Sequence, residues 1–229
     1  MVVGRGMIAN AFFSYELSRD VVIFASGVSN SLLNEESDFR RERELLMQSI
    51  KSNPNAIIVY FGTCSVNDPE LFNTPYVIHK LEMERLIERE CKNYFIFRLS
   101  QVVGRGSSPT LINFIVDRLE KRESFSVWKN STRNLIDVED VFKITDYLIQ
   151  NNIFMNEITN IAAPFSLSIF DIVATVEELL GQKGCYEVED RGGSYEINSD
   201  KIAPFLDEIG VRFDKNYPSL IIKKYFLDE

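Results

Sequence analysis

Short apolar runs alternate with longer amphipathic stretches through the first half of the chain. Continuous apolar runs predict buried strands at residues 1–3, 21–25, 56–61 and 94–99. Between them, residues 7–17, 39–50 and 76–91 show the helical spacing of apolar positions. Strands that alternate with helices are typical of a parallel sheet with helices on both faces. The pattern therefore predicts an α/β fold.

The second half of the chain is less regular. Its pattern predicts helices at residues 111–119, 138–149 and 168–180, strands at 124–128 and 158–162, and a mixed tail with a helical stretch at 202–209. Gly181 follows the third of these helices as a C-cap. We expect this half to pack as a small lobe over the rim of the sheet.

Composition narrows the class of protein. The chain has 229 residues and a net charge of -9, which argues against a nucleic-acid or anionic membrane surface. No apolar stretch approaches the roughly 20 residues that span a bilayer, and residues 1–6 do not resemble a signal peptide. Three scattered cysteines predict reduced thiols in a cytoplasmic protein, and a single histidine leaves little basis for a metal site.

Four small or polar loops follow the predicted strands. They are residues 4–6, 26–31, 63–65 and 101–106. In open parallel sheets, ligands bind beyond the carboxyl ends of the strands. We therefore expect the functional site where these loops meet.

The first loop, Gly4-Arg5-Gly6-Met7-Ile8-Ala9, has the spacing of a dinucleotide-binding fingerprint. Its glycines would let the backbone approach a pyrophosphate at the start of the following helix. Glycine turns between a strand and a helix are also common without any ligand.

Tyr76 and Lys80 lie four residues apart on a predicted helix, so their side chains share one face. An ammonium beside a phenol favours the phenolate and lowers its pKa towards the range of a working acid or base. Thr63, from the end of the preceding strand, could hold the reacting oxygen. The structural alternative is an aromatic anchor beside a solvated charge.

Five further segments, taken in their order along the chain, resemble the motifs of a known family. These segments are Val22-Ile23-Phe24-Ala25-Ser26-Gly27, Thr63 with its following Val66, Tyr76 with Lys80, Arg98-Leu99-Ser100-Gln101-Val102-Val103-Gly104, and Arg133-Asn134-Leu135-Ile136-Asp137-Val138-Glu139-Asp140-Val141. Together with the glycine loop, they resemble the extended short-chain dehydrogenase/reductase family, the NAD-dependent epimerase/dehydratase group acting on nucleotide sugars. The resemblance covers nearly the whole chain.

The resemblance implies a Rossmann-like fold and a set of roles. Residues 1–110 would form a truncated dinucleotide-binding core, and residues 111–229 the remaining sheet elements and a small substrate-binding lobe, as one compact unit. Tyr76 would be the acid/base, Lys80 would lower its pKa and hold the nicotinamide ribose, and Thr63 would bind the reacting oxygen, with Ser65 a second candidate. NAD or NADP would contact Gly4, Arg5, Gly6, Met7, Ile8, Ala25, Ser26, Gly27 and Lys80. The substrate would contact Gln101 and Arg133.

The chain also departs from the family pattern. It runs from the first helix directly to Val21, without the two strands that usually follow and that lie at the sheet edge. Much of the adenine pocket would be lost with them. The spacer between Thr63 and Tyr76 is short, and Gln101 stands where asparagine is usual. Cys64 follows Thr63 where dehydratases carry an acid, which favours an epimerase or a reductase.

Two hypotheses follow. The first is an NAD(P)-dependent nucleotide-sugar epimerase or ketoreductase. It would act in the synthesis of sugars for surface polysaccharides and could form a homodimer. The second is a non-catalytic Rossmann-like protein that binds a sugar nucleotide or a protein partner.

Five other polar residues are expected to be structural. We expect His79 to face outward on its helix and Cys64 to be a packed small residue. We expect Asp137, Glu139 and Asp140 to cap a helix rather than bind a metal.

Overall fold

The core of the protein is a parallel five-stranded sheet. The computed structural model describes residues 1–29, 35–106 and 110–226. The strands run in the order β1 (Val2–Val3), β2 (Val21–Phe24), β3 (Ile57–Thr63), β4 (Tyr94–Leu99) and β9 (Ile158–Ile161). All neighbouring strands in this sheet are parallel. The predicted α/β fold is confirmed, and each of its strands coincides with a predicted apolar run.

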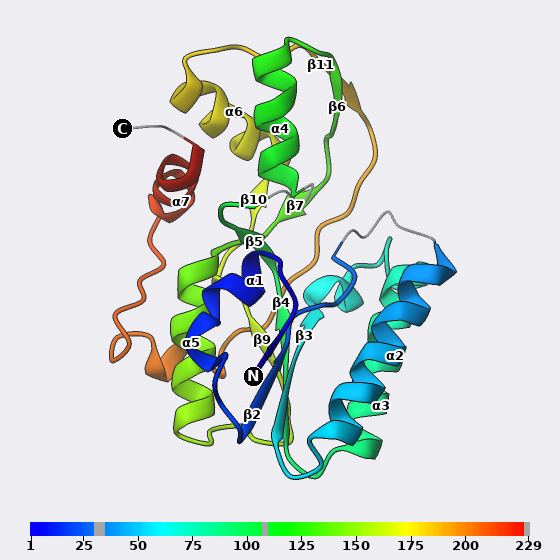
Figure 1. Cartoon of the computed structure of the whole chain (residues 1–229). Helices are drawn as coiled ribbons and strands as arrows, with labels where there is room; N and C mark the ends of the chain where they lie inside the picture. Colours follow the sequence, from blue (N-terminus) through cyan, green and yellow to red (C-terminus); the bar gives the residue numbers. More distant parts are fainter. Residues whose placement is uncertain (30–34, 107–109, 227–229) are drawn as a thin grey trace.

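Helices cover both faces of this sheet (Figure 1). One face carries α2 (Glu36–Ser52) and α3 (Pro75–Glu90), and the other carries α1 (Met7–Ala11) and α5 (Val138–Gln150). Their apolar faces supply the two halves of the core. Leu46, Met83 and Ile87 are buried on the first side, and Phe12 and Ile144 on the second. A sheet buried on both faces requires uninterrupted apolar strands, which is the pattern that the sequence shows.

Two buried carboxylates lie among the apolar residues of the α2–α3 face. Glu84, on α3, is 2 % exposed and accepts two hydrogen bonds from the Arg98 guanidinium, at 2.9 and 2.6 Å. The two-point geometry joins α3 to β4 and satisfies both groups. The second carboxylate, Glu42 on α2, belongs to the candidate site.

A second group of elements lies beyond the carboxyl ends of the strands (Figure 1). It contains α4 (Leu111–Lys121), α6 (Ile169–Leu180), α7 (Tyr217–Phe226), and the parallel pair β6 (Phe125–Trp128) and β11 (Tyr186–Glu189). These elements share their own apolar cluster, which includes Ile112, Val127, Ile172 and Ile221. Two small pairs connect the groups: β5 (Gln101–Val103) with β8 (Leu135–Asp137), and β7 (Thr132–Arg133) with β10 (Leu167–Ser168).

The sheet edge is formed by β1, which pairs with β2 alone among the described strands. The resemblance placed the loss of two strands at this edge. The observed order is compatible with that prediction because β2, β3, β4 and β9 still form a continuous sheet.

Some local predictions are confirmed. Asp137 caps α5 by accepting a hydrogen bond from the backbone of Glu139 at 2.9 Å, and Asp140 lies in the first turn. Gly181 ends α6 in the left-handed conformation that a C-cap requires, with φ of 62°.

Other local predictions are wrong. The first helix ends at Ala11 instead of continuing to Leu17, whose side chain is 91 % exposed. Phe12 leaves helical geometry there, and a 3₁₀ turn follows at Phe13–Tyr15. Residues 202–209 contain only the 3₁₀ turn Ala203–Phe205. Residues 101–103, predicted as part of a loop, form strand β5 because they pair with β8. The other short strands β7, β8, β10 and β11 and helix α7 were not predicted from the sequence.

None of the helices in the described residues is both long and apolar enough to cross a membrane.

Two adjacent phenylalanines provide a test of this core. Phe12 is fully buried, with ring centres of Phe61 and Phe142 at 5.2 and 5.1 Å, whereas Phe13 is 74 % exposed. We expect Phe12→Ala to lower the free energy of unfolding by about 3–5 kcal/mol through the cavity that it leaves. Phe13→Ala should change it by less than about 0.5 kcal/mol. Urea denaturation of both variants checks this, and equal effects would contradict the described packing.

Candidate active site

A cavity of about 1020 Å³ opens at the carboxyl ends of the strands. Its walls include residues from all four loops that the sequence placed at this rim: Gly6, Ser26, Thr63 and Gln101 are examples. Side chains from beyond the rim, among them Phe114, close the other side. The prediction that these loops meet at one site is confirmed, although residues 30, 31 and 107–109 lie outside the described part of the chain.

The cavity brings together nearly all the residues selected from the sequence. Its lining includes Arg5, Gly6, Met7, Ile8, Ala25, Ser26, Gly27, Thr63, Ser65, Tyr76, Lys80, Gln101 and Arg133. Gly4 is the exception, since it is not among the lining residues.

The two glycines of the first loop lie in different surroundings, and only one of them is required by the fold. Gly4 has φ of +140°, and a Cβ there would lie 2.4 Å from the Ala25 carbonyl oxygen, so the fold itself requires glycine. A Cβ at Gly6 would meet no atom within 4 Å. No neighbour in the described chain requires glycine at this position, and the space above it belongs to the cavity.

The helix that follows the glycine loop is short. Helix α1 has only five residues, so its dipole is smaller than that of a long helix. An anion above Gly6 would depend mainly on nearby backbone N–H groups and cationic side chains.

Thr63 and Cys64 mark the end of β3. The Thr63 hydroxyl accepts a hydrogen bond from the Ser65 backbone at 3.1 Å, which caps the short 3₁₀ turn Cys64–Asn67. Cys64 is 1 % exposed and its thiol contacts the Arg98 carbonyl at 3.2 Å. Burial raises the pKa of this thiol to about 12. Cys64 is therefore a packed small residue, as predicted.

Tyr76 lies in the first turn of α3. Thr74 caps this helix and Pro75 starts it, so the position of the helix start is set by local sequence. The ring of Tyr76 is 6 % exposed and packs with Val28 and Val77. Its hydroxyl makes no hydrogen bond to any described residue. A phenol in the cavity wall with a free hydroxyl is able to bind or exchange a proton with a ligand.

Lys80 contacts a different phenol from the one expected. Its ammonium donates to Glu42 Oε1 at 3.2 Å and to the Tyr60 hydroxyl at 3.1 Å. Lys80 is 3 % exposed, yet it belongs to the cavity lining. The ammonium is therefore anchored from below by α2 and β3, while one of its three N–H donors has no partner in these two contacts.

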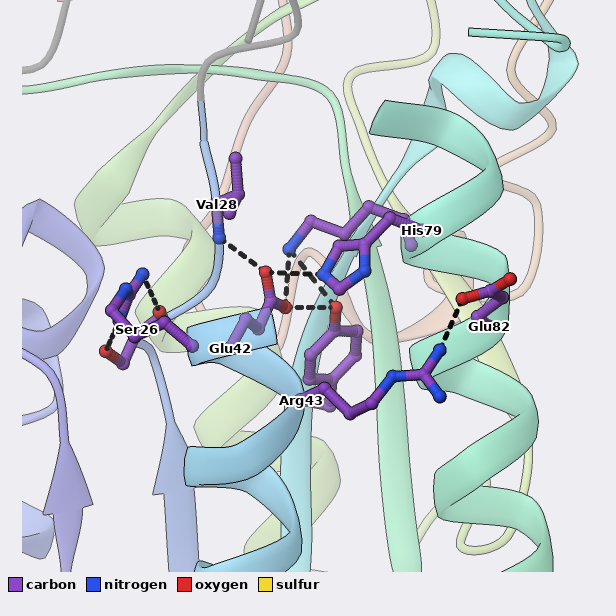
Figure 2. Close-up of polar contacts among 9 residues, drawn as sticks. Ser26, Val28, Glu42, Arg43, His79 and Glu82 are labelled. Atoms are coloured by element: carbon purple, nitrogen blue, oxygen red, sulfur yellow. Dashed lines mark hydrogen bonds and ion pairs between the residues drawn. The ribbon is translucent and has the colours of Figure 1, made fainter. Parts of the chain in front are cut away.

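Glu42 is the centre of this polar cluster, and Figure 2 shows it between Val28 and His79. Oε1 accepts from Tyr60 at 2.7 Å and from Lys80, and Oε2 accepts from the Val28 backbone at 2.6 Å and contacts His79 Nε2 at 3.1 Å. Four contacts saturate a carboxylate. Burial by itself would raise the pKa of Glu42, but the Lys80 charge and these hydrogen bonds outweigh it and lower the pKa to about 2.

The prediction for His79 is wrong. Its ring is 4 % exposed, contacts Glu42, and stacks on Phe39 with ring centres 4.6 Å apart. Helix α2 packs over this part of α3 and covers a position that the sequence alone placed on the outer face. Glu42 itself was missed because it stands within Arg40-Arg41-Glu42-Arg43-Glu44, a pattern typical of a solvated helix surface.

The charged side chains of the cavity lining are mostly cationic, in a chain whose net charge is -9. The lining cations are Arg5, Arg41, Lys80, Arg133 and Arg191, and the lining acids are Asp68 and Glu189. Arg133 donates to the adjacent Thr132 carbonyl at 2.7 Å and makes no ion pair with a described carboxylate. The lining therefore favours an anionic ligand.

Several lining residues escaped the sequence analysis. The Arg191 guanidinium lies 4.1 Å from the ring centre of Trp128, and the Tyr195 hydroxyl interacts with that of Ser65. Ser100 and Ser131 have buried hydroxyl oxygens without a hydrogen-bond partner among the described residues. Trp128 lies in β6 and Arg191 and Tyr195 follow β11, so their positions depend on how the chain returns to the rim. Only the two serines carried a local signal, because Ser100 precedes Gln101 and Ser131 is two residues before Arg133.

Comparison with known proteins identifies the family. Residues 18–162 match the NAD dependent epimerase/dehydratase family, which is more than half of the chain. The chain belongs to this family. The match starts after the glycine loop, so the assignment of this loop rests on its sequence and its geometry and not on the family match. A search of curated proteins finds no significant match.

Solved structures of similar fold support the Rossmann-like assignment. The UDP-glucuronic acid 4-epimerase of Bacillus cereus, solved with UDP-glucuronic acid and NAD, has 16% identity and a TM-score of 0.72, covering 94% of this chain and 77% of its own. WbmH of Bordetella bronchiseptica, solved with NAD+, has 16% identity and a TM-score of 0.71, covering 97% and 80%. RMD of Pseudomonas aeruginosa, solved with NADPH, has 15% identity and a TM-score of 0.66, covering 90% and 81%.

The Glu42 cluster generates a prediction about acid stability. Because the folded-state pKa of about 2 lies below the ordinary 4.5, Glu42 stabilises the fold above pH 4.5 and this contribution is lost as the pH falls towards 2. We expect Glu42→Gln to lower the free energy of unfolding by roughly 3–5 kcal/mol at neutral pH, because the Lys80 ammonium loses its partner. The difference from the wild type should narrow below about pH 4.5.

Urea denaturation across this pH range measures the difference. Glu36→Gln, whose carboxylate is 88 % exposed on the same helix, is the control and should match the wild type. A Glu42→Gln deficit that stays constant with pH would contradict the assigned ionisation.

Proposed function

We propose that this protein is an NAD(P)-dependent enzyme that acts on a nucleotide sugar as an epimerase or ketoreductase. The observation that carries the proposal is the unpaired Tyr76 hydroxyl, which lines the same cavity as Thr63 and the open face of Gly6. Family membership and the ligands of the similar structures support this class of reaction.

The residues present fit a nicotinamide dinucleotide. The open space at Gly6, where a Cβ would meet no atom within 4 Å, would let a pyrophosphate approach the backbone, and Arg5 and Arg41 line the same cavity. Arg41 also holds the second loop, through 3.2 Å hydrogen bonds to the Ser26 hydroxyl and carbonyl oxygens. Lys80 would use its remaining N–H to bind a ribose hydroxyl. The dinucleotide, when bound, supplies hydride transfer.

The substrate would occupy the side of the cavity nearer α4 and β6. Arg133 offers a guanidinium that donates to the Thr132 carbonyl but has no ion-pair partner among the described residues, and its planar donors suit phosphate oxygens. Gln101, Ser131 and Tyr195 also line the cavity, with amide and hydroxyl groups suited to a sugar. A diphosphate-linked sugar would satisfy both the cationic and the neutral polar groups.

The proton transfer falls to the chain's own residues. Tyr76 would give or take the proton of a sugar carbonyl or hydroxyl, and Thr63 would hold the same oxygen, with Ser65 as the second candidate. The dehydratase reaction is disfavoured because Cys64, a buried thiol, follows Thr63 in place of an acid.

The second candidate function is binding without catalysis. The observation that favours it is the edge position of β1, which leaves no described strand on the side where an adenosine would lie. Under this alternative, Tyr76 would be a wall of a sugar-nucleotide site or of a partner site and would move no proton.

Gly6→Val tests the dinucleotide site. A Cβ at Gly6 meets no atom within 4 Å, so we expect little change in Tm. The same side chain would fill the space for a pyrophosphate, so the Kd for NADH and NADPH should rise at least about tenfold, or roughly 1.4 kcal/mol. Titration calorimetry measures both ligands. Unchanged binding by a folded Gly6→Val protein would reject this position for the dinucleotide.

Tyr76→Phe separates the two candidate functions. The change removes only the hydroxyl, so NADH binding and Tm should remain near the wild-type values. Turnover should fall about 10²–10⁴-fold, the usual contribution of a positioned acid/base. UDP-glucose and UDP-glucuronic acid, with mass spectrometry of ligands retained on purification, provide the first substrates for the assay. Full activity of Tyr76→Phe would contradict the catalytic role.

A further inference from the structure

We propose that Glu42 is a positioning residue for cofactor binding, which acts by fixing the Lys80 ammonium in the cavity floor with one N–H donor directed to the ligand. This inference rests on the proposed function, because it assigns the partner that makes Lys80 competent. Neither the family match nor the sequence pattern of Tyr76 and Lys80 requires a carboxylate at position 42.

The geometry fixes where the ammonium lies. Glu42 Oε1 and the Tyr60 hydroxyl, 2.7 Å apart, each accept a hydrogen bond from Lys80, so two of its three N–H donors point away from the cavity. A Cβ at Gly27 would lie 2.6 Å from Lys80 Nζ, so the second loop covers the ammonium closely. The ammonium is held between the loop, α2 and β3.

Glu42 is itself held rigidly. It is fully buried, and its other oxygen is occupied by the Val28 N–H and by His79. These contacts join α2, the second loop and α3 at one carboxylate. A carboxylate with all its acceptor sites filled has one orientation, and so it imposes one orientation on Lys80.

Glu42 also supplies the counter-charge for the buried Lys80 ammonium. A buried ammonium without a counter-ion is costly, and it responds by losing its proton or by moving towards water. In either case Lys80 would stop presenting a charged donor at the cavity floor. Glu42 prevents both outcomes.

The chain offers a matched control for this idea. Glu84 is also a buried carboxylate, lies on the same face of the sheet, and pairs with a cation, Arg98. Neither Glu84 nor Arg98 lines the cavity. Glu84→Gln should therefore reproduce the structural cost of losing a buried ion pair without affecting Lys80.

The experiment measures the Kd for NADH by ligand fluorescence in a double-mutant cycle. We expect Glu42→Gln and Lys80→Met each to raise the Kd about tenfold or more, and Glu84→Gln to change it less than twofold. The double variant Glu42→Gln/Lys80→Met should bind no more weakly than Lys80→Met, because Glu42 acts only through Lys80.

A pH profile adds a readout that loss of stability would not move. The titratable groups around Lys80 are its partners Glu42 from α2 and Tyr60 from β3. On its own helix, His79 contacts Glu42, and Tyr76 lies one turn earlier and lines the same cavity. In Glu42→Gln, the affinity should fall as the pH rises above neutral, because an unpartnered Lys80 loses its proton more easily. This dependence should disappear in the double variant, which assigns it to Lys80 and not to His79 or Tyr60.

The outcomes are distinguishable. If the wild type binds NADH and Glu42→Gln binds it with the same Kd, this inference is overturned while the proposed function stands. The same holds if the double variant binds NADH much more weakly than Lys80→Met. Failure of the wild type to bind NADH or NADPH would reject the proposed function and this inference with it. If Glu42→Gln does not fold, Tyr60→Phe removes one acceptor of Lys80 and should raise the Kd two- to fivefold. An unchanged Kd in folded Tyr60→Phe would equally overturn the inference.

Discussion

The pairing of buried carboxylates with cations on the α2–α3 face is the constraint on which the cavity depends. Glu84 joins α3 to β4 through Arg98, and Glu42 joins α2 to α3 and β3 through Lys80 and Tyr60. A buried charge tolerates little displacement, since each lost hydrogen bond leaves it both desolvated and unpaired. The apolar contacts of these helices allow sliding, whereas the ion pairs define one register. The floor of the cavity is thereby fixed even though its upper wall comes from elements distant in the sequence.

The strands of the sheet could be predicted because burial on both faces leaves a simple trace, a continuous apolar run. The positions of Tyr76 and Thr63 on the rim followed from the same alternation of strands and helices. Glu42 could not be predicted, because a glutamate among arginines has the same local pattern on a solvated helix and on a helix whose inner edge meets a buried lysine. The prediction that His79 faces outward was wrong for a related reason, since only the packing of α2 determines which side of α3 is covered.

The upper wall of the cavity escaped prediction for another reason. Trp128 reaches it from β6, and Arg191 and Tyr195 reach it from the irregular segment after β11. Strand β11 pairs with β6 across some 60 residues of sequence. No local periodicity marks such a pairing. Family resemblance helped only where a motif is contiguous, as in the segment around Arg133, and the cavity side chains outside such motifs depended on tertiary structure.

The glycine loop is attached to the shortest strand of the sheet. Strand β1 contributes two residues and is bonded on one side, so the loop after it is supported by fewer backbone hydrogen bonds than the loops after β3 and β4. Segments at such an edge open locally at lower free energy than the centre of a sheet. A ligand bound at Gly6 would then stabilise this edge against local opening. Occupancy of the cavity and slowed amide hydrogen exchange at residues 2–6 become two measures of the same equilibrium.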